Sequence, residues 1–249
     1  MIFKGRAKRL DDIDLPRIGA RIGVGEDEIH AILDVEAAGK GFDAKGRPTM
    51  LFEPHVFYRE LGAGPDRDRA VKAGLAYPKW KRDYPKDSYP RLLKAMQINE
   101  DAALRSCSWG LGQIMGFNCI AAGYHSAAEM VTDFLDDEEK HLDAMITFII
   151  TAKLDRFLRA RDWAGFARGY NGTGFAKNGY DRKLAQAFHK WQQIKDTPWE
   201  PEEPTSPSPA KKTGSGAVSV GAGAAVAGAT GLALFWDKVS AWFAGIFGG

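Results

Sequence analysis

Glu36 is the first side chain in the sequence whose type and spacing could do acid chemistry. The segment 26–36, EDEIHAILDVE, places Ile29, Ile32, Leu33 and Glu36 on one helical face. A carboxyl group on such an apolar face is desolvated, which favours its protonated form and suits a general acid near neutral pH. The alternative for Glu36 is a structural ion pair or a side chain that reaches solvent past the helix end.

A second carboxylate is available at Asp43 or Glu53. Glu53 follows an apolar run and directly precedes Pro54, so its side chain could face the same groove as Glu36. Equally, it could be an N-terminal helix acid that satisfies free N–H groups. In enzymes that cleave glycosidic bonds with two carboxylates, their separation decides between a retaining and an inverting course.

Two further segments offer hydrogen-bonding groups. Residues 106–118, SCSWGLGQIMGFN, hold three glycines that permit close backbone approach. This segment could form the floor of a ligand groove with Ser108 and Gln113 as donors, or it could be tight helix packing under a core. Tyr170 and Asn171 end an apolar helix and present a phenol and an amide, which suit sugar rings and N-acetyl groups.

Other kinds of site are excluded by the residues present. The five histidines are scattered, there is no HExxH motif or CxxC pair, and residues 106–118 lack the GK[ST] ending of a phosphate-binding loop. We therefore expect no metal and no cofactor. Cys107 and Cys119 are interpreted as small buried thiols rather than a disulfide. With 34 Lys+Arg against 32 Asp+Glu, the net charge of +2 does not indicate nucleic-acid binding.

The elements that must position these groups are predicted to be mostly helical. Apolar spacing indicates helices in 91–106, 141–158, 163–170 and 180–194. The Lys45-Gly46 turn signal and the extended run 49–52 predict a small hairpin, and Pro54 predicts the first turn of a helix. Residues 70–90, rich in aromatic and basic side chains and prolines, are predicted to form a long surface loop. The fold class is therefore α+β, mostly α.

Composition divides the chain into three parts. Residues 1–195 form the predicted folded domain, 196–215 a proline-rich linker, and 216–249 a Gly/Ala-rich tail. The linker carries four acids and two lysines and the tail one of each, which leaves the domain at +4. The N-terminus has no apolar run after its basic residues, so no cleavable signal peptide is expected.

The tail combines an uncharged stretch with an apolar end. Residues 213–236 contain no charged side chain, and about 20 helical residues suffice to cross a bilayer core. Small residues four apart suit helix–helix contact in a membrane, and 239–249 carry aromatic residues. The tail is predicted to be a transmembrane or membrane-associated helix; the alternative is a Gly/Ala spacer with an apolar docking tag.

Taken in order, these segments resemble the N-acetylmuramidase domain of bacteriophage endolysins. The resemblance covers about residues 10–193. It is carried by VEAAGKGFD (35–43), GRP (46–48), LFEPHVFY (51–58), SWGLGQIMGFN (108–118), FARGYNG (166–172) and Tyr180-Asp181. The Gly-Leu-Gly-Gln and Tyr-Asn-Gly elements also resemble those of goose-type lysozymes and lytic transglycosylases, where they line the sugar groove.

The resemblance implies a lysozyme-like fold with a small hairpin next to the catalytic helix. It also implies hydrolysis of the β-1,4 bond between N-acetylmuramic acid and N-acetylglucosamine in peptidoglycan, causing host lysis. Glu36 matches the family's catalytic glutamate; Glu53 is the expected second carboxylate, and Ser108, Gln113, Tyr170 and Asn171 become groove residues. The alternatives are a lytic transglycosylase, which uses one glutamate and forms 1,6-anhydro ends, and a non-catalytic cell-wall tether.

Location and partners follow from the same reasoning. Lys211 and Lys212 before the predicted span favour a cytoplasmic enzyme domain. We therefore expect a monomer held in the host cytoplasm or at the inner membrane, which reaches periplasmic peptidoglycan only after membrane disruption by a partner such as a holin.

Overall fold

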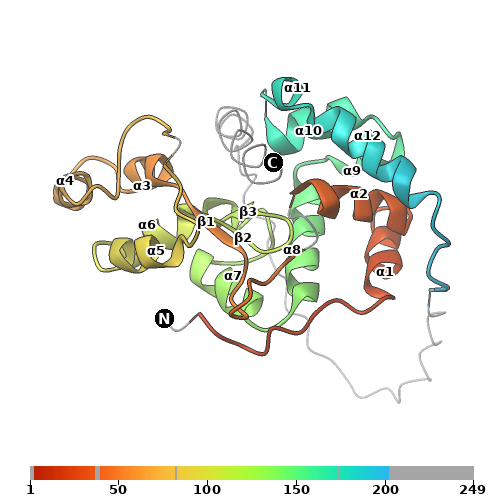
Figure 1. Cartoon of the computed structure of the whole chain (residues 1–249), viewed down its shortest axis with the longest axis horizontal. Helices are drawn as coiled ribbons and strands as arrows, with labels where there is room; N and C mark the ends of the chain where they lie inside the picture. Colours follow the sequence, from red (N-terminus) through yellow and green to blue (C-terminus); the bar gives the residue numbers. More distant parts are fainter. Residues whose placement is uncertain (1–2, 37–39, 82, 173, 202–249) are drawn as a thin grey trace, which may run out of the picture.

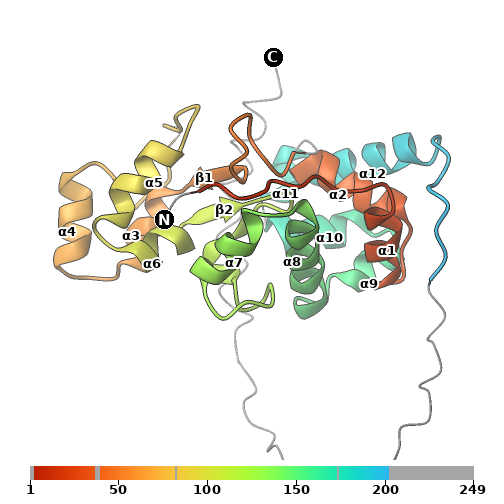
Figure 2. The ribbon, with the colours of Figure 1, turned by 90° about the horizontal axis from the view of Figure 1, so that it is seen from below.

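The computed structural model describes residues 3–36, 40–81, 83–172 and 174–201. Two groups of helices lie at opposite ends of a small antiparallel sheet, and helices α7 and α8 lie beside the sheet (Figures 1 and 2). This confirms the α+β, mostly α prediction. The predicted tail, residues 216–249, and most of the linker lie outside the described residues, so those two predictions stay predictions.

The first group contains the helix that ends at Glu36 and the helices that pack on it. Its members are α1 (Asp14–Ala20), α2 (Glu26–Glu36), α9 (Asp155–Arg159), α10 (Trp163–Asn171), α11 (Phe175–Asn178) and α12 (Tyr180–Trp191). Helix α12 lies along α2 (Figure 1). The predicted apolar face of α2 is buried, with Ile29 and Ile32 fully enclosed. At the far end, the His30 and Trp191 rings stack 3.6 Å apart, so α12 fixes α2 along its length.

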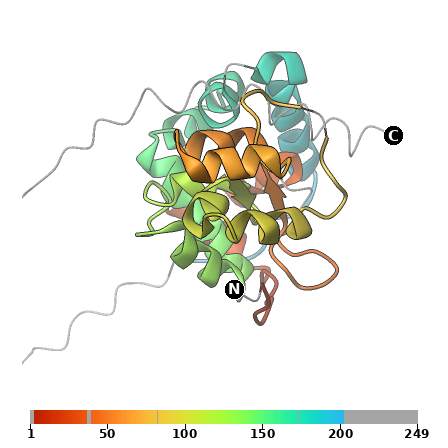
Figure 3. The ribbon, with the colours of Figure 1, turned by 90° about the vertical axis from the view of Figure 1, so that its left-hand side faces the viewer.

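The second group occupies the opposite end and stands nearest the viewer in Figure 3. It comprises α3 (Pro54–Glu60), α4 (Pro65–Lys72), α5 (Tyr89–Met96) and α6 (Glu100–Arg105). Pro54 is the first residue of α3, as predicted. The helix expected over 91–106 is two helices instead, because Asn99 caps α6 by accepting a hydrogen bond from the Ala102 N–H at 3.0 Å.

The sheet joins the two groups. It consists of β1 (Met50–Phe52), β2 (Cys107–Trp109) and β3 (Ile114–Met115) in that order, followed by the short 3₁₀ helix η1 (Gly116–Asn118). Strand β1 pairs with β2, with Leu51 opposite Ser108. The segment 42–48 contributes a single bridge, Phe42 to Pro48. The turn predicted at Lys45-Gly46 is therefore present, but the sheet hairpin is made by β2 and β3.

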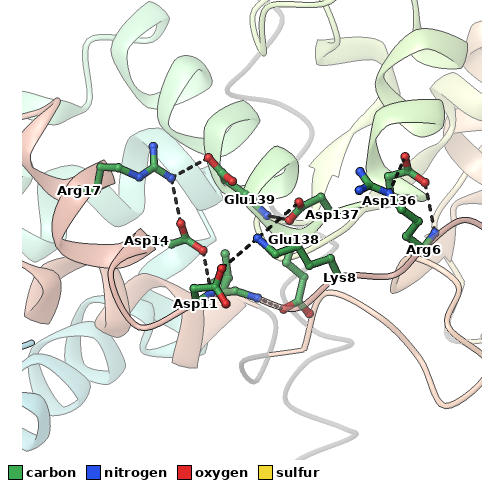
Figure 4. Close-up of polar contacts among 10 residues, drawn as sticks. Arg6, Lys8, Asp11, Asp14, Arg17, Asp136, Asp137, Glu138 and Glu139 are labelled. Atoms are coloured by element: carbon green, nitrogen blue, oxygen red, sulfur yellow. Dashed lines mark hydrogen bonds and ion pairs between the residues drawn. The ribbon is translucent and has the colours of Figure 1, made fainter.

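Helices α7 (Ala127–Phe134) and α8 (Glu138–Thr151) complete the fold. An N-terminal strap, defined here as residues 3–11, crosses the junction between them. Lys8 N–H donates to Asp136 O at 2.8 Å, and Glu138 N–H donates to Lys8 O at 3.0 Å. Arg6 pairs with Asp136 (Figure 4). Residues 6–8 are thus held against residues 135–138.

One further prediction, on the two cysteines, can be compared with the described part of the chain. Cys107 and Cys119 are free and buried, as predicted. Among the described residues, no helix has both the length and the apolar character needed to cross a membrane.

Candidate active site

The Glu36 carboxyl group is buried at the last residue of α2. Its side chain is 1% exposed, and Asn171 Nδ2 donates a hydrogen bond to Oε1 at 2.7 Å. Burial raises the pKa of Glu36 to about 7, although the Asn171 hydrogen bond and the Lys183 charge act in the opposite direction. A carboxyl group with this pKa holds a proton for a large fraction of the time near neutral pH.

Two polar atoms lie next to this hydrogen bond. Glu36 Oε2 and Asn171 Oδ1 are both buried and accept no hydrogen bond from the described residues. Because Asn171 donates to Oε1, the proton of neutral Glu36 belongs on Oε2. The site therefore presents one O–H donor beside one amide acceptor, which suits proton delivery to an incoming oxygen.

Tyr170 supports Asn171 from the preceding position of α10. Its hydroxyl donates to Gly112 O at 2.8 Å, in the turn between β2 and β3, and its ring is fully buried. Burial, reinforced by the nearby Glu36 carboxylate, raises the pKa of Tyr170 well above its ordinary value. Tyr170 therefore stays a neutral donor that ties helix α10 to the sheet hairpin.

Ser108 and Gln113 lie in that hairpin, and their polar atoms face each other. Ser108 Oγ donates to Gln113 Oε1 at 2.8 Å, and Gln113 Nε2 donates to Gly110 O at 2.9 Å. Both side chains are buried. The segment is a strand–turn–strand unit and not packed helix, and these two residues maintain its shape from within.

Glu53 occupies a different environment. Its side chain is fully buried, Oε2 accepts a hydrogen bond from the Tyr84 hydroxyl, and His55 Nδ1 lies 3.3 Å from the same oxygen. Glu53 occupies the N-cap position of α3, but its carboxylate makes no capping hydrogen bond to the described N–H groups of the helix. Its other oxygen, Oε1, has no hydrogen-bond partner among the described residues.

Glu36 and Glu53 share no hydrogen-bond partner in the described part of the chain. Asp43, the other carboxylate considered, accepts from the Lys45 and Arg47 N–H groups at 2.8 and 3.0 Å and pairs with the Arg47 guanidinium. Asp43 therefore stabilises the turn at 43–47. Among the predicted groove residues in the described part of the chain, Asn171 hydrogen-bonds to Glu36.

Three residues that act on the two carboxyl groups were not predicted from the sequence. Lys183 acts on Glu36 through its charge, and Tyr84 and His55 contact Glu53. The spacing of His55, two residues after Glu53, was a usable signal. Tyr84 lies in the aromatic and basic loop and Lys183 on an exposed helix face, so nothing local in the sequence connects either residue to a carboxylate.

Within the described residues, no cluster of histidine, cysteine and acidic side chains could hold a metal ion. His141, the most buried histidine, is held between backbone groups of Phe134 and Leu111. Burial lowers the pKa of His141 to about 4, so it remains neutral.

The chain is similar to known proteins. The family model described as Muramidase, N-acetylmuramidase, matches residues 26–192. The crystal structure of the Burkholderia AP3 phage endolysin superposes with a TM-score of 0.68 at 37% sequence identity, covering 75% of this chain and 73% of that one. No curated protein matches the chain. The matched range contains Glu36, Glu53 and all four predicted groove residues.

Proposed function

The chain belongs to the N-acetylmuramidase family and is a glycoside hydrolase of the lysozyme type that degrades peptidoglycan; from this premise we propose that Glu36 is its general acid. The bond proposed to break is the β-1,4 link between N-acetylmuramic acid and N-acetylglucosamine. The observation that carries the proposal is the buried Glu36 carboxyl group, whose pKa is about 7 and whose Oε2 has no hydrogen-bond partner among the described residues.

The proposed mechanism begins with proton transfer. Glu36 Oε2–H donates its proton to the glycosidic oxygen as the C1–O bond breaks, and positive charge develops on the sugar ring. Asn171 Nδ2 then stabilises the carboxylate that remains, because its hydrogen bond to Oε1 favours the ionised form. Asn171 Oδ1 is free to accept a hydrogen bond from a substrate N–H or O–H group.

Glu53 is the proposed second carboxylate, which stabilises the positive ring or orients water. One observation favours the alternative of a lytic transglycosylase, which needs a single glutamate. Glu53 is fully buried, engages Tyr84 and His55, and shares no hydrogen-bond partner with Glu36 among the described residues. Mass spectrometry of released muropeptides separates the two reactions, because only transglycosylation leaves 1,6-anhydro ends.

The decisive experiment replaces Glu36 with Gln and measures clearing of purified peptidoglycan. The substitution keeps the size of the side chain and removes its acid proton, so activity should fall below a few per cent while the fold is retained. Glu28→Gln is the matched control, because Glu28 is also a buried carboxylate of α2 but binds Arg161 at 3.0 Å. Substantial activity in Glu36→Gln would refute the assignment. A non-catalytic tether would give no clearing with the unmodified chain.

The biological setting proposed is that of an endolysin that lyses a bacterial host. The chain is proposed to act as a monomer, stay in the cytoplasm or at the inner membrane through residues 216–249, and reach the cell wall after a holin-type partner opens the membrane. The uncharged stretch 213–236 supports the membrane part of this proposal.

A further inference from the structure

Helix α8 begins with two buried polar side chains that the proposed mechanism does not use. Glu138 and His141 are 4% and 0% exposed and stand one helical turn apart on the same face. A buried carboxylate and a buried imidazole are expensive to maintain unless their hydrogen bonds are satisfied. The partners of both residues therefore show what this turn of α8 holds in place.

Glu138 binds two segments at once. Oε1 accepts from Gly41 N–H at 3.0 Å and from Arg9 Nη1 at 2.6 Å, and Oε2 accepts from Leu10 N–H at 3.1 Å. Its neighbours Asp136, Asp137 and Glu139 also face basic residues of the N-terminal region (Figure 4). Among these four acids, Glu138 alone reaches Gly41, which follows Glu36 by five positions.

His141 holds another segment, the turn between β2 and β3. Its Nε2–H donates to Phe134 O at 2.8 Å, since a carbonyl can only accept. Its Nδ1 is therefore the acceptor for Leu111 N–H at 3.3 Å. Leu111 adjoins Gly112, whose carbonyl accepts the Tyr170 hydroxyl.

The segment at Gly41 and the turn between β2 and β3, both held by α8, meet at Thr49. Thr49 N–H donates to Gly41 O at 2.7 Å, and Thr49 O accepts from Gly110 N–H at 2.8 Å. The hydrogen bonds thus form a closed circuit that leaves Glu138, passes through Gly41, Thr49 and the hairpin turn, and returns to α8 at His141. Tyr170 connects this circuit to Asn171, the residue bonded to Glu36.

The contacts along the circuit leave little free space. A Cβ atom on Gly41 would lie 2.7 Å from Glu138 Cγ, and one on Gly110 would lie 2.8 Å from His141 Cγ. Both distances are below any real Cβ contact, so glycine is required at each position. A displacement of the Glu138 carboxylate is therefore transmitted to the Gly41 backbone and is not absorbed by a gap.

We infer that Glu138 is a positioning residue for peptidoglycan cleavage, acting through Gly41 and Thr49 on the hairpin turn that fixes Tyr170 and Asn171 beside Glu36. The inference rests on the proposed role of Glu36. We expect turnover to depend on the contact between the Glu138 side chain and Gly41, and not on the ion pair between Glu138 and Arg9.

Two conservative substitutions separate reach from charge. Glu138→Gln keeps the chain length and one carbonyl oxygen for Gly41 N–H, but it removes the charge and replaces the oxygen that accepts from Leu10 N–H with an NH₂ group. Glu138→Asp keeps the charge for the flexible, half-exposed Arg9 but is one methylene too short for Gly41. We expect Glu138→Asp to lower kcat on purified peptidoglycan about 10-fold or more with KM within about threefold, because misplacement of reacting groups lowers turnover. Glu138→Gln should keep kcat within about threefold of the unmodified enzyme.

Glu139→Gln is the matched control, because Glu139 is the neighbouring acid and binds Arg17 at 2.7 Å without contacting Gly41. It should leave kcat unchanged. The reverse order, with Glu138→Asp active and Glu138→Gln impaired, would overturn the inference in favour of the ion pair. Unchanged kcat in both variants, whatever their unfolding midpoints, would also overturn it. If Glu138→Asp fails to fold, Glu138→Gln still decides, since reduced kcat there contradicts the inference.

The parallel assay of Glu36→Gln keeps the two proposals apart. An active Glu36→Gln enzyme refutes the general-acid assignment regardless of Glu138. An inactive Glu36→Gln enzyme together with a fully active Glu138→Asp enzyme refutes only the positioning role.

Discussion

At the scale of single residues, the buried carboxyl group of Glu36 links activity to stability. Its pKa is about 7 in the folded chain against an ordinary value of 4.5, because burial disfavours the ionised form. A raised pKa means that the folded state binds more protons than the unfolded state between these two values. Glu36 therefore does not lower the free energy of unfolding below pH 4.5, and it lowers that free energy as the pH rises through 7.

The pH dependence of stability predicts the effect of Glu36→Gln. At pH 8 the substitution removes a buried negative charge, so the free energy of unfolding should exceed that of the unmodified chain by up to about 3 kcal/mol. At pH 4 the two proteins should differ little. Urea unfolding at both pH values provides the measurement, and equal stabilities at pH 8 would contradict the raised pKa.

The Lys183 charge gives a prediction for the pH profile. Lys183 lowers the pKa of Glu36, so Lys183→Gln should raise that pKa. Because the proposed general acid, Glu36, must be protonated to act, the alkaline fall in kcat/KM should move to higher pH. Lys190→Gln is the control on the same helix, since Lys190 pairs with Asp34 at 2.9 Å. A profile that stays in place in Lys183→Gln would show that the charge does not reach Glu36.

At the scale of elements, the turn between β2 and β3 depends on its glycines. Gly110 has a φ of 68°, and a Cβ there would meet the His141 ring; Gly62 has a φ of 62° with nothing within 4 Å of such an atom. Gly62→Ala should cost about 1–2 kcal/mol for the left-handed backbone alone. Gly110→Ala should cost about 1–3 kcal/mol more through overpacking, and it should also lower activity.

Denaturant unfolding of the two alanine variants, with peptidoglycan clearing measured on each, checks this difference. Equal losses of stability would mean that the His141 ring yields to the new methyl group and that the turn is held less tightly than the contacts indicate.

The sequence predicted those features of the helices that depend on residues close together in the chain. The apolar spacing of Ile29 and Ile32 placed the buried face of α2, and Pro54 marked the first residue of α3. The pairing of β1 with β2 joins segments more than 50 residues apart, so local pattern could not predict it. The helix predicted over 141–158 is divided at Lys153, whose φ of 57° ends α8 before α9 begins.

The residues of the candidate site were likewise predicted only in part. Burial of Glu36 follows from its own helix. Asn171 was identified as an amide suited to sugar groups, but its hydrogen bond to Glu36 joins positions 135 residues apart and has no local signal. The interior bonding of Ser108 and Gln113 depends on the hairpin that pairs them, which the glycine-rich sequence left undetermined. Glu138 was missed because its partners lie 97 and 129 residues away.

At the scale of the whole molecule, the tail can be tested separately from the enzyme. Thr197 N–H donates to Glu26 Oε1 at 2.7 Å, so a chain ending at Pro201 keeps this contact and should cleave purified peptidoglycan like the full chain. If residues 216–249 bind membrane, the full chain should fractionate with inner membranes and the shortened chain should remain in the supernatant. Identical fractionation would support the spacer interpretation.

The pairing of α2 with α12 and of Glu36 with Asn171 also constrains when the enzyme can become active during synthesis. Asn171 follows Glu36 by 135 residues and Trp191 follows its partner Asp34 by 157. At about 5–20 residues per second, the ribosome needs on the order of 10 s after Glu36 to supply Asn171. Until then Glu36 is hydrated, with the ordinary acidity of a free glutamate, so a nascent or prematurely terminated chain cannot attack the cell wall.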